Sequence, residues 1–227
     1  MRRGVRALST VLLLAGALLL ADAGLTVAWQ EPVSALYGRL NQDRLAGQLS
    51  GLERAAPSPV ETRALRALPS GERRLAFLAR SLRRRARPGQ AVGRVAIPRI
   101  GADFVVINGT RAPDLRAGPG LYEQTPFPGT GATTAIAGHR TTYGAPFRRL
   151  DRLRRGDAVT VTMPYGRFTF RVEGTRIVPP TELSVIRPVG YDRLVLSACH
   201  PLYSAAQRII VFARLQGARP RGPALKL

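Results

Sequence analysis

Cysteine, lysine and histidine are scarce in this sequence of 227 residues. Cys199 is the only cysteine, Lys226 is the only lysine, and the two histidines are His139 and His200. A single cysteine excludes an intrachain disulfide, so an oxidising compartment is neither required nor excluded. A nucleophilic Cys–His pair would therefore have to combine Cys199 with one of only two histidines.

Acidic residues are also few, because 14 Asp and Glu stand against 35 Lys and Arg, which gives a formal net charge of +21. Such a basic chain favours anionic partners such as nucleic acid, acidic wall polymers or lipid headgroups. None of the known nucleic-acid-reading motifs occurs, and we expect no nucleic-acid partner.

One long apolar run is present, at residues 7–29, and Asp22 is the only acid in it. A helix needs about 20 residues to cross a bilayer, and three arginines precede the run, which predicts a cytoplasmic N-terminus. We expect residues 1–30 to be a retained single-pass membrane anchor. The alternative is a signal peptide cleaved at the small-x-small segment 21–23. Both interpretations place the rest of the chain outside the cytoplasm.

Residues 31–90 are predicted to form a partly helical stalk or linker. Leucines recur there at near-helical spacing, at positions 36, 40, 45, 49 and 52. Pro57 and Pro59 interrupt the pattern, and a second helical stretch covers residues 60–85 with a break at 69–71. The basic run at 83–87 is interpreted either as a solvated spacer or as a contact for anionic headgroups or wall polymer.

After residue 89 the pattern changes to short β-type segments between turns. The predicted strands are residues 92–97, 104–107, 133–137, 158–163, 167–175, 194–198 and 208–215. Residues 164–166 read as a hairpin turn, and 114–116 and 147–153 as short helical turns. Many short strands without regular helices between them predict a mostly β fold, a small closed or nearly closed barrel. We assign residues 91–217 to this barrel and 218–227 to a basic C-terminal tail.

The residues with chemical potential lie at strand ends. Cys199 follows the strand at 194–198, and His139 follows the strand at 133–137. His200 is a poorer partner for the thiol, because successive strand side chains point to opposite faces. A buried structural cysteine and a histidine satisfied by its own loop are the alternative interpretations.

Arg208 begins the last predicted strand. If the last two strands pair as a hairpin, Arg208 returns beside Cys199, where a guanidinium could stabilise an oxyanion. An arginine without such a role is the alternative in a chain this rich in arginine.

His139, Cys199 and Arg208, together with the segment VLSACHP at 195–201, resemble the sortase family. The nine-residue step from Cys199 to Arg208 matches that family, and the segment GHRTTYGAPF at 138–147 is most similar to class E sortases. The resemblance covers roughly residues 90–216 and the N-terminal anchor. Val195 and Ala198 stand where the family usually has threonines.

The resemblance implies a sortase-like closed barrel of about eight strands with short helices and a membrane-anchored cysteine transpeptidase. Cys199 would attack the Thr–Gly carbonyl of a Leu-Pro-x-Thr-Gly or Leu-Ala-x-Thr-Gly sorting signal and form a thioester. His139 would protonate the leaving amine, and Arg208 would hold the oxyanion. Tyr143 and Ala198 are the candidate substrate-binding residues.

The implied partners are surface proteins that carry a sorting signal, an amine acceptor from peptidoglycan precursor or a pilin lysine, and the membrane. Tyr143 matches a class E position associated with Leu-Ala-x-Thr-Gly preference, or it simply packs over the loop. Residues 174–191 fit the variable loop over the substrate groove. We expect no cofactor and no metal, because no acidic cluster like that of calcium-dependent relatives is evident.

Two other functions remain open. A cysteine peptidase would transfer the same thioester to water instead of an amine. A non-enzymatic, membrane-tethered module would use the basic surface to bind anionic wall polymer and would not need Cys199. A transpeptidase of wall crosslinks is disfavoured, because its Ser-His-Gly-Cys motif differs from the Ser-Ala-Cys-His segment found here.

Overall fold

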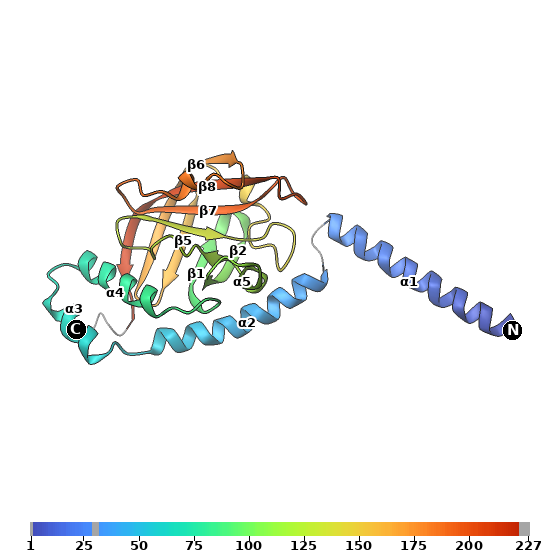
Figure 1. The fold of residues 1–227 in the computed structure, drawn as a ribbon, viewed down its shortest axis with the longest axis horizontal. Helices are drawn as coiled ribbons and strands as arrows, with labels where there is room; N and C mark the ends of the chain where they lie inside the picture. Colours follow the sequence, from blue (N-terminus) through green and yellow to red (C-terminus); the bar gives the residue numbers. More distant parts are fainter. Residues whose placement is uncertain (1, 29–31, 223–227) are drawn as a thin grey trace.

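A closed barrel of eight strands forms the centre of the computed structural model, which describes residues 2–28 and 32–222 (Figure 1). The strand order around the barrel is β1-β2-β3-β4-β7-β8-β6-β5. The strands are β1 (Ala91–Ile97), β2 (Ala102–Asn108), β3 (Gly120–Leu121), β4 (Thr133–Ala137), β5 (Ala158–Met163), β6 (Gly166–Val178), β7 (Arg193–His200) and β8 (Gln207–Pro220). The predicted mostly β, closed-barrel fold is confirmed.

Short helices connect several of these strands. They are η1 (Pro98–Ile100), α5 (Ala112–Ala117), η2 (Leu150–Arg152) and η3 (Leu183–Ile186). The helical turns predicted at 114–116 and 147–153 correspond to α5 and to the region of η2. The hairpin predicted at 164–166 joins β5 to β6, whose register runs from Ala158↔Arg171 to Met163↔Gly166.

The strands differ in how many faces they bury. In β5 buried and half-buried positions alternate, as expected for a strand with one face on the core. In β4 every residue is buried, and β7 is buried from Leu194 to Ala198. Both faces of this pair are covered, because the loop with η3 packs Val185 against Ala135 and Val195 outside the barrel. Burying each of the two valine side chains contributes about 1.5–3 kcal/mol, so β4 and β7 form a well-packed support.

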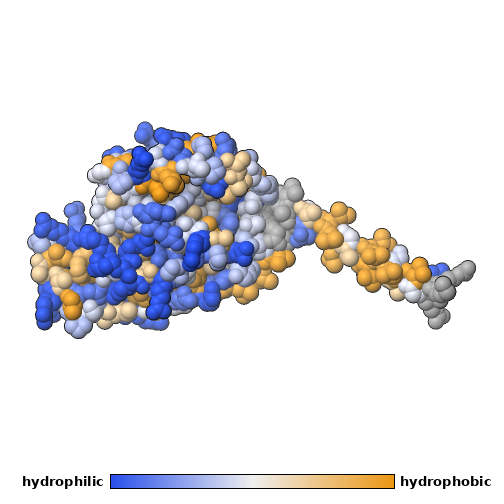
Figure 2. Space-filling view, in the orientation of Figure 1, coloured by the Kyte–Doolittle hydropathy of each residue, from blue (hydrophilic) through white to orange (hydrophobic). Residues whose placement is uncertain are grey.

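Four helices precede the barrel: α1 (Arg2–Ala28), α2 (Pro32–Arg54), α3 (Pro59–Ala67) and α4 (Gly71–Arg85). Residues 4–24 of α1 are long and apolar enough to cross a membrane, and none of that stretch is buried. Figure 2 shows apolar side chains along α1, in contrast to the mainly hydrophilic surface over α3, α4 and the barrel.

The helices after α1 pack on the barrel. Leu45 and Leu49 of α2 are buried against Val105 and Ile107 of β2. From α4, Leu75, Leu78 and Leu82 join the main core. In the basic run at 83–87, Arg83 donates a hydrogen bond to Asn108 and Arg85 forms an ion pair with Glu61. Two arginines of that run therefore make contacts within the protein.

Candidate active site

Cys199 and Arg208 face each other across the β7–β8 hairpin. The two strands pair antiparallel from Arg193↔Arg214 to His200↔Gln207, and Cys199 lies directly opposite Arg208. Directly opposed residues project to the same face of the sheet with Cβ atoms about 4.5–5.5 Å apart. Cys199 is a half-buried free thiol. The hairpin thus brings a thiol and a guanidinium to one place.

His139 reaches the same edge of the barrel from β4. β4 pairs parallel with β7, from Thr133↔Arg193 to Ala137↔Ser197, and the Gly138 amide continues the ladder by donating to the Ser197 carbonyl at 3.0 Å. His139 follows Ala137 by two residues, as Cys199 follows Ser197. Parallel register therefore sets His139 beside Cys199, on the strand flanking β7 opposite to β8.

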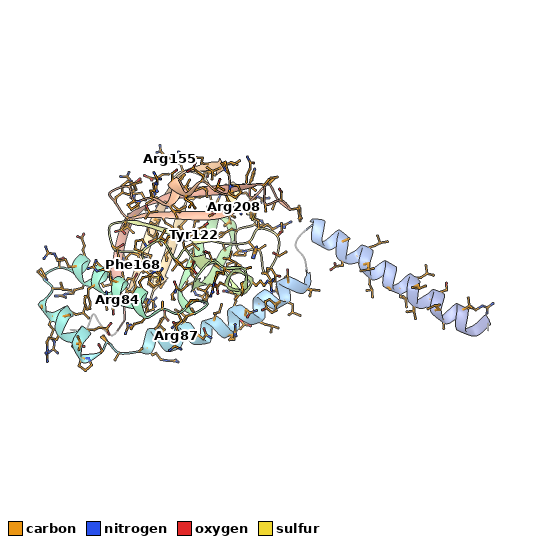
Figure 3. All side chains as sticks on the ribbon, viewed as in Figure 1. Arg84, Arg87, Tyr122, Arg155, Phe168 and Arg208 are labelled. Carbon is orange, nitrogen blue, oxygen red and sulfur yellow. The ribbon has the colours of Figure 1, made fainter. Side chains whose placement is uncertain are left out.

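The position of this edge in the molecule is visible in Figure 3. Arg208 lies at the barrel end nearer to α1 and the start of α2, whereas Phe168 lies on the side toward α4. The candidate site and the α4 side are therefore separated by the barrel core.

The loop after His139 is closed by its own backbone. The Phe147 amide donates to the His139 carbonyl at 3.0 Å. A Cβ at Gly138 would lie 2.7 Å from the Phe147 ring, so only glycine fits this approach. The loop 139–147 is fixed at both ends next to the site.

The surroundings of His139 favour its neutral form. Burial lowers the pKa of His139 below its ordinary value of 6.5, and the positive charge of Arg116 lowers it further. The Tyr143 ring lies 5.2 Å from the imidazole, tilted by 46°. At neutral pH the imidazole is therefore mainly uncharged and able to accept a proton.

His200 is engaged elsewhere. Its Nδ1 lies 3.3 Å from Nη1 of Arg140, whose side chain is 3% exposed. The same guanidinium donates to the Arg148 carbonyl and to Asp151, the latter at 2.7 Å. Because an arginine can only donate, His200 accepts through Nδ1. This ring belongs to the hydrogen-bond network of the buried Arg140 guanidinium.

Arg208 is held by its own loop. Its Nη1 donates to the carbonyls of Ala205 and Gln207, both at 2.9 Å. A guanidinium has five N–H donors, so several remain for a substrate oxygen. The side chain is half-buried and close to the strand end.

The two candidate substrate-binding residues differ in placement. Tyr143 is half-buried on the loop, in a left-handed backbone conformation with φ of 53°, beside the His139 ring. Ala198 is 3% exposed, and its methyl group belongs to the main core cluster. A hydroxyl-bearing side chain at 198 would likewise point into the core, so a substrate contact from this position would have to come from the backbone.

Three features near the site were not predicted from the sequence. These are the Arg116 charge beside His139, the buried Arg140 network, and α2, whose Ser34 accepts a hydrogen bond from the Tyr143 amide at 3.0 Å. Arg140 directly follows His139, but nothing in the sequence marks it among so many arginines. Within residues 2–28 and 32–222, no group of three or more His, Cys, Asp or Glu could hold a metal ion.

Comparison with known proteins gives one consistent answer. The chain is 33% identical over 130 residues to Sortase D of Bacillus subtilis, a match that covers 56% of this chain and 64% of that protein. It therefore spans less than two thirds of that relative's own length.

Solved structures agree in fold. Sortase E from Streptomyces avermitilis has a TM-score of 0.54 and 33% identity, covering 61% of this chain and 99% of that one. Sortase E1 from Streptomyces coelicolor, solved with a tripeptide in the active site, has a TM-score of 0.56 and 25% identity, with coverages of 62% and 99%. The Sortase domain family model matches residues 95–216, which include all of β4, β7 and the three candidate catalytic residues. With more than half of its length matched by that model, the chain belongs to the sortase family.

Proposed function

We propose that this protein is a membrane-anchored, extracytoplasmic cysteine transpeptidase that cleaves a Leu-Ala-x-Thr-Gly or Leu-Pro-x-Thr-Gly sorting signal between Thr and Gly. One observation carries the proposal: Cys199, His139 and Arg208 project from three adjacent strand ends, β7, β4 and β8. Family membership supports the reaction type, and the tripeptide in the active site of Sortase E1 supports peptide binding by the relative.

The reaction begins with a proton transfer from the Cys199 thiol to the neutral imidazole of His139. The thiolate attacks the Thr carbonyl carbon, and the carbonyl oxygen gains the negative charge that Arg208 stabilises. The C–N bond to glycine then breaks, and imidazolium His139 returns its proton to the leaving amine. A thioester between Cys199 and Thr remains.

The second half of the reaction runs these steps in reverse order with a different amine. The acceptor amine attacks the thioester carbonyl, and His139 takes its excess proton. The new amide forms as the Cys199 sulfur leaves and is reprotonated. The acceptor is a peptidoglycan precursor or a pilin lysine, and the client is a surface protein that carries the sorting signal.

Membrane attachment follows from α1 in this proposal. Residues 4–24 span a bilayer, and the arginines at positions 2, 3 and 6, before and at the start of this stretch, keep the N-terminus in the cytoplasm. Residues 31–90 then connect the anchor to the catalytic barrel, 91–217. Tyr143 contributes the preference for Leu-Ala-x-Thr-Gly, and the connection 174–191 covers the substrate groove.

Cys199→Ala and His139→Ala test this function in the full-length protein. Wild type is expected to release the C-terminal fragment of a quenched-fluorophore sorting peptide. With an amine acceptor present, the N-terminal fragment should be recovered as the amide of that amine and not as the carboxylic acid that hydrolysis gives. Both variants should lose thioester formation, seen by mass spectrometry of the intact protein, while their circular dichroism stays that of wild type.

Three outcomes would redirect the proposal. Hydrolysis unaffected by added amine would indicate a cysteine peptidase. Retention of all function in Cys199→Ala would indicate the polymer-binding module. Equal rates on the Leu-Ala and Leu-Pro peptides would refute the role given to Tyr143.

A further inference from the structure

The first two turns of α2 contact the loop 139–147, called the catalytic loop below, directly. Ser34 is 8% exposed, and its Oγ accepts a hydrogen bond from the amide of Tyr143 at 3.0 Å. Ala35, the next residue, is also 8% exposed. These contacts join residues more than a hundred positions apart, so they are a feature of the tertiary fold.

Gly38 makes the closest approach between helix and loop. A Cβ at this position would lie 2.8 Å from the carbonyl carbon of Tyr143, 2.9 Å from its oxygen and 3.0 Å from the nitrogen of Gly144. At the other two glycines of α2, Gly47 and Gly51, a Cβ would meet nothing within 4 Å. Glycine is unfavourable inside a helix. At position 38 it is required by the packing, because any side chain would displace the backbone of the loop.

Aromatic rings continue this contact to the catalytic histidine. The Tyr37 ring meets the Tyr143 ring edge-on, at 6.0 Å and 69°, and the Tyr143 ring lies 5.2 Å from the imidazole of His139. Tyr143 has a φ of 53°, a conformation that non-glycine residues rarely adopt and that surrounding contacts must hold in place. Ser34 and Gly38 supply two of those contacts.

We propose that α2 is a positioning element of the catalytic site, in which Ser34 and Gly38 fix the backbone of Tyr143 and the Tyr143 ring in turn fixes the imidazole of His139. This inference rests on the proposed function, because it assigns α2 a part in placing the general acid and base. α2 lies outside residues 95–216, the part matched by the family model. The contact is thus a property of this chain's own N-terminal region.

Gly38→Ala and Gly47→Ala form a matched pair for the test. Both place alanine, the better helix former, in the same helix. The methyl group enters open space at 47 and collides with the Tyr143 backbone at 38. Each variant is compared with wild type as the full chain in lipid nanodiscs, using the quenched sorting peptide for kcat and KM and thermal unfolding for stability.

Gly38→Ala is expected to lower kcat at least about 10-fold, because a displacement of about 1 Å near the chemistry can cost up to 100-fold. KM for the Leu-Ala-x-Thr-Gly peptide should rise as well, because the displaced Tyr143 also contributes to recognition of that peptide in the proposed function. Gly47→Ala should remain within about 2-fold of wild type, as is usual for exposed sites.

A spectroscopic readout separates positioning from loss of folded protein. With isotope-labelled histidine, the chain shows only the ring signals of His139 and His200, which His200→Gln assigns. In Gly38→Ala the His139 signal should shift, because the Tyr143 ring moves. Its titration midpoint should rise toward 6.5 as water reaches the ring, with Arg116 still opposing the rise. The His200 signal should stay in place.

Equal kcat and an unchanged His139 signal in Gly38→Ala would overturn the inference, as would equal losses in both glycine variants. If Gly38→Ala fails to fold, Ser34→Ala replaces it, with the same expected shift of the His139 signal and a smaller loss of kcat. Absence of thiol-dependent cleavage in wild type would refute the proposed function, while the His139 signal would still report whether α2 positions the ring.

Discussion

His139 and Arg208 flank Cys199 from opposite sides, and their surroundings suit different tasks. Burial and the positive charge of Arg116 lower the pKa of His139 and keep it neutral, which suits proton transfer. Arg208 is oriented by two loop carbonyls, which suits charge stabilisation without reorganisation during the reaction.

Replacing Arg208 tests the oxyanion role. Arg208→Gln is expected to lower kcat by about 100–1,000-fold, the usual cost of removing one oxyanion donor. Arg208→Lys keeps the charge but loses the planar guanidinium, so its activity should fall between that of wild type and that of Arg208→Gln. Stopped-flow cleavage of the sorting peptide measures both. Arg219→Gln, at the exposed far end of the same strand, is the control, and an equal loss there would contradict the assignment.

Rare residues at strand ends made the main site residues predictable. One cysteine and two histidines leave few pairs, and strand alternation separates Cys199 from His200. Arg116 and Arg140 were missed because arginine is abundant in this chain, so its presence at a position carries little information. The role of Ser34 was also hidden, since it depends on a contact with residue 143 that no local pattern encodes.

At the scale of secondary structure, a strand could be predicted only where enough of its residues show the alternation of apolar and polar side chains. The seven predicted strands all occur, but β6 and β8 extend beyond their predicted ends at 175 and 215, to Val178 and Pro220. The added residues 176–178 pair with 208–210, and the added residues 217–220 pair with 166–169. Most of the added residues are exposed, so they lack the alternation of buried and exposed positions that marks a strand. β3 has only two residues, too few for any periodicity, and was not predicted.

The contact between α3 and α4 contains a buried carboxylate. Glu61 is 7% exposed and completes a capping box with Ser58. It also accepts a hydrogen bond from Ser81 and pairs with Arg85 at 3.2 Å. Burial alone would raise the pKa of Glu61, but these hydrogen bonds and the Arg85 charge outweigh it and lower the pKa below 4.5.

Glu61→Gln is therefore expected to destabilise the protein by about 1–3 kcal/mol at neutral pH, because buried donors lose a charged acceptor. A lowered pKa means that the unfolded state binds more protons near pH 4.5, so the Glu61 contribution is present above that pH and is lost as pH falls through the lower folded pKa. Denaturant unfolding at pH 7 and at pH 3 measures it. The exposed Glu72→Gln, in the first turn of α4, is the control, and an unfolding difference that does not shrink in acid would contradict the assignment.

At the scale of the molecule, the candidate site lies at the barrel end toward α1 and the start of α2. Arg208 lies at the barrel end toward α1 and the start of α2, and α2 contacts the catalytic loop (Figures 1 and 3). In the proposed function, a newly exported sorting signal would reach Cys199 from the side of the molecule nearest α1.

The single cysteine allows the topology to be measured without any engineered label site. In intact cells, a membrane-impermeant maleimide is expected to modify Cys199, because the proposed catalytic domain is extracytoplasmic and the thiol is half-buried rather than enclosed. Cys199→Ala should take up no label. Labelling of the wild-type protein only after permeabilisation would contradict the proposed orientation.

The parallel pairing of β4 with β7 has a consequence for how the protein matures. His139 and Cys199 are sixty residues apart in the chain, and bringing such ends together costs roughly 4 kcal/mol of loop entropy before any contact forms. A chain that is synthesised from its N-terminus and exported behind α1 presents β4 before β7 and β8. β4 is then present before the last strands of the barrel, and Cys199 comes to lie beside His139 only when the barrel closes. In the proposed function, reactive chemistry is thus withheld from nascent chains, because the active site forms only when the fold is complete.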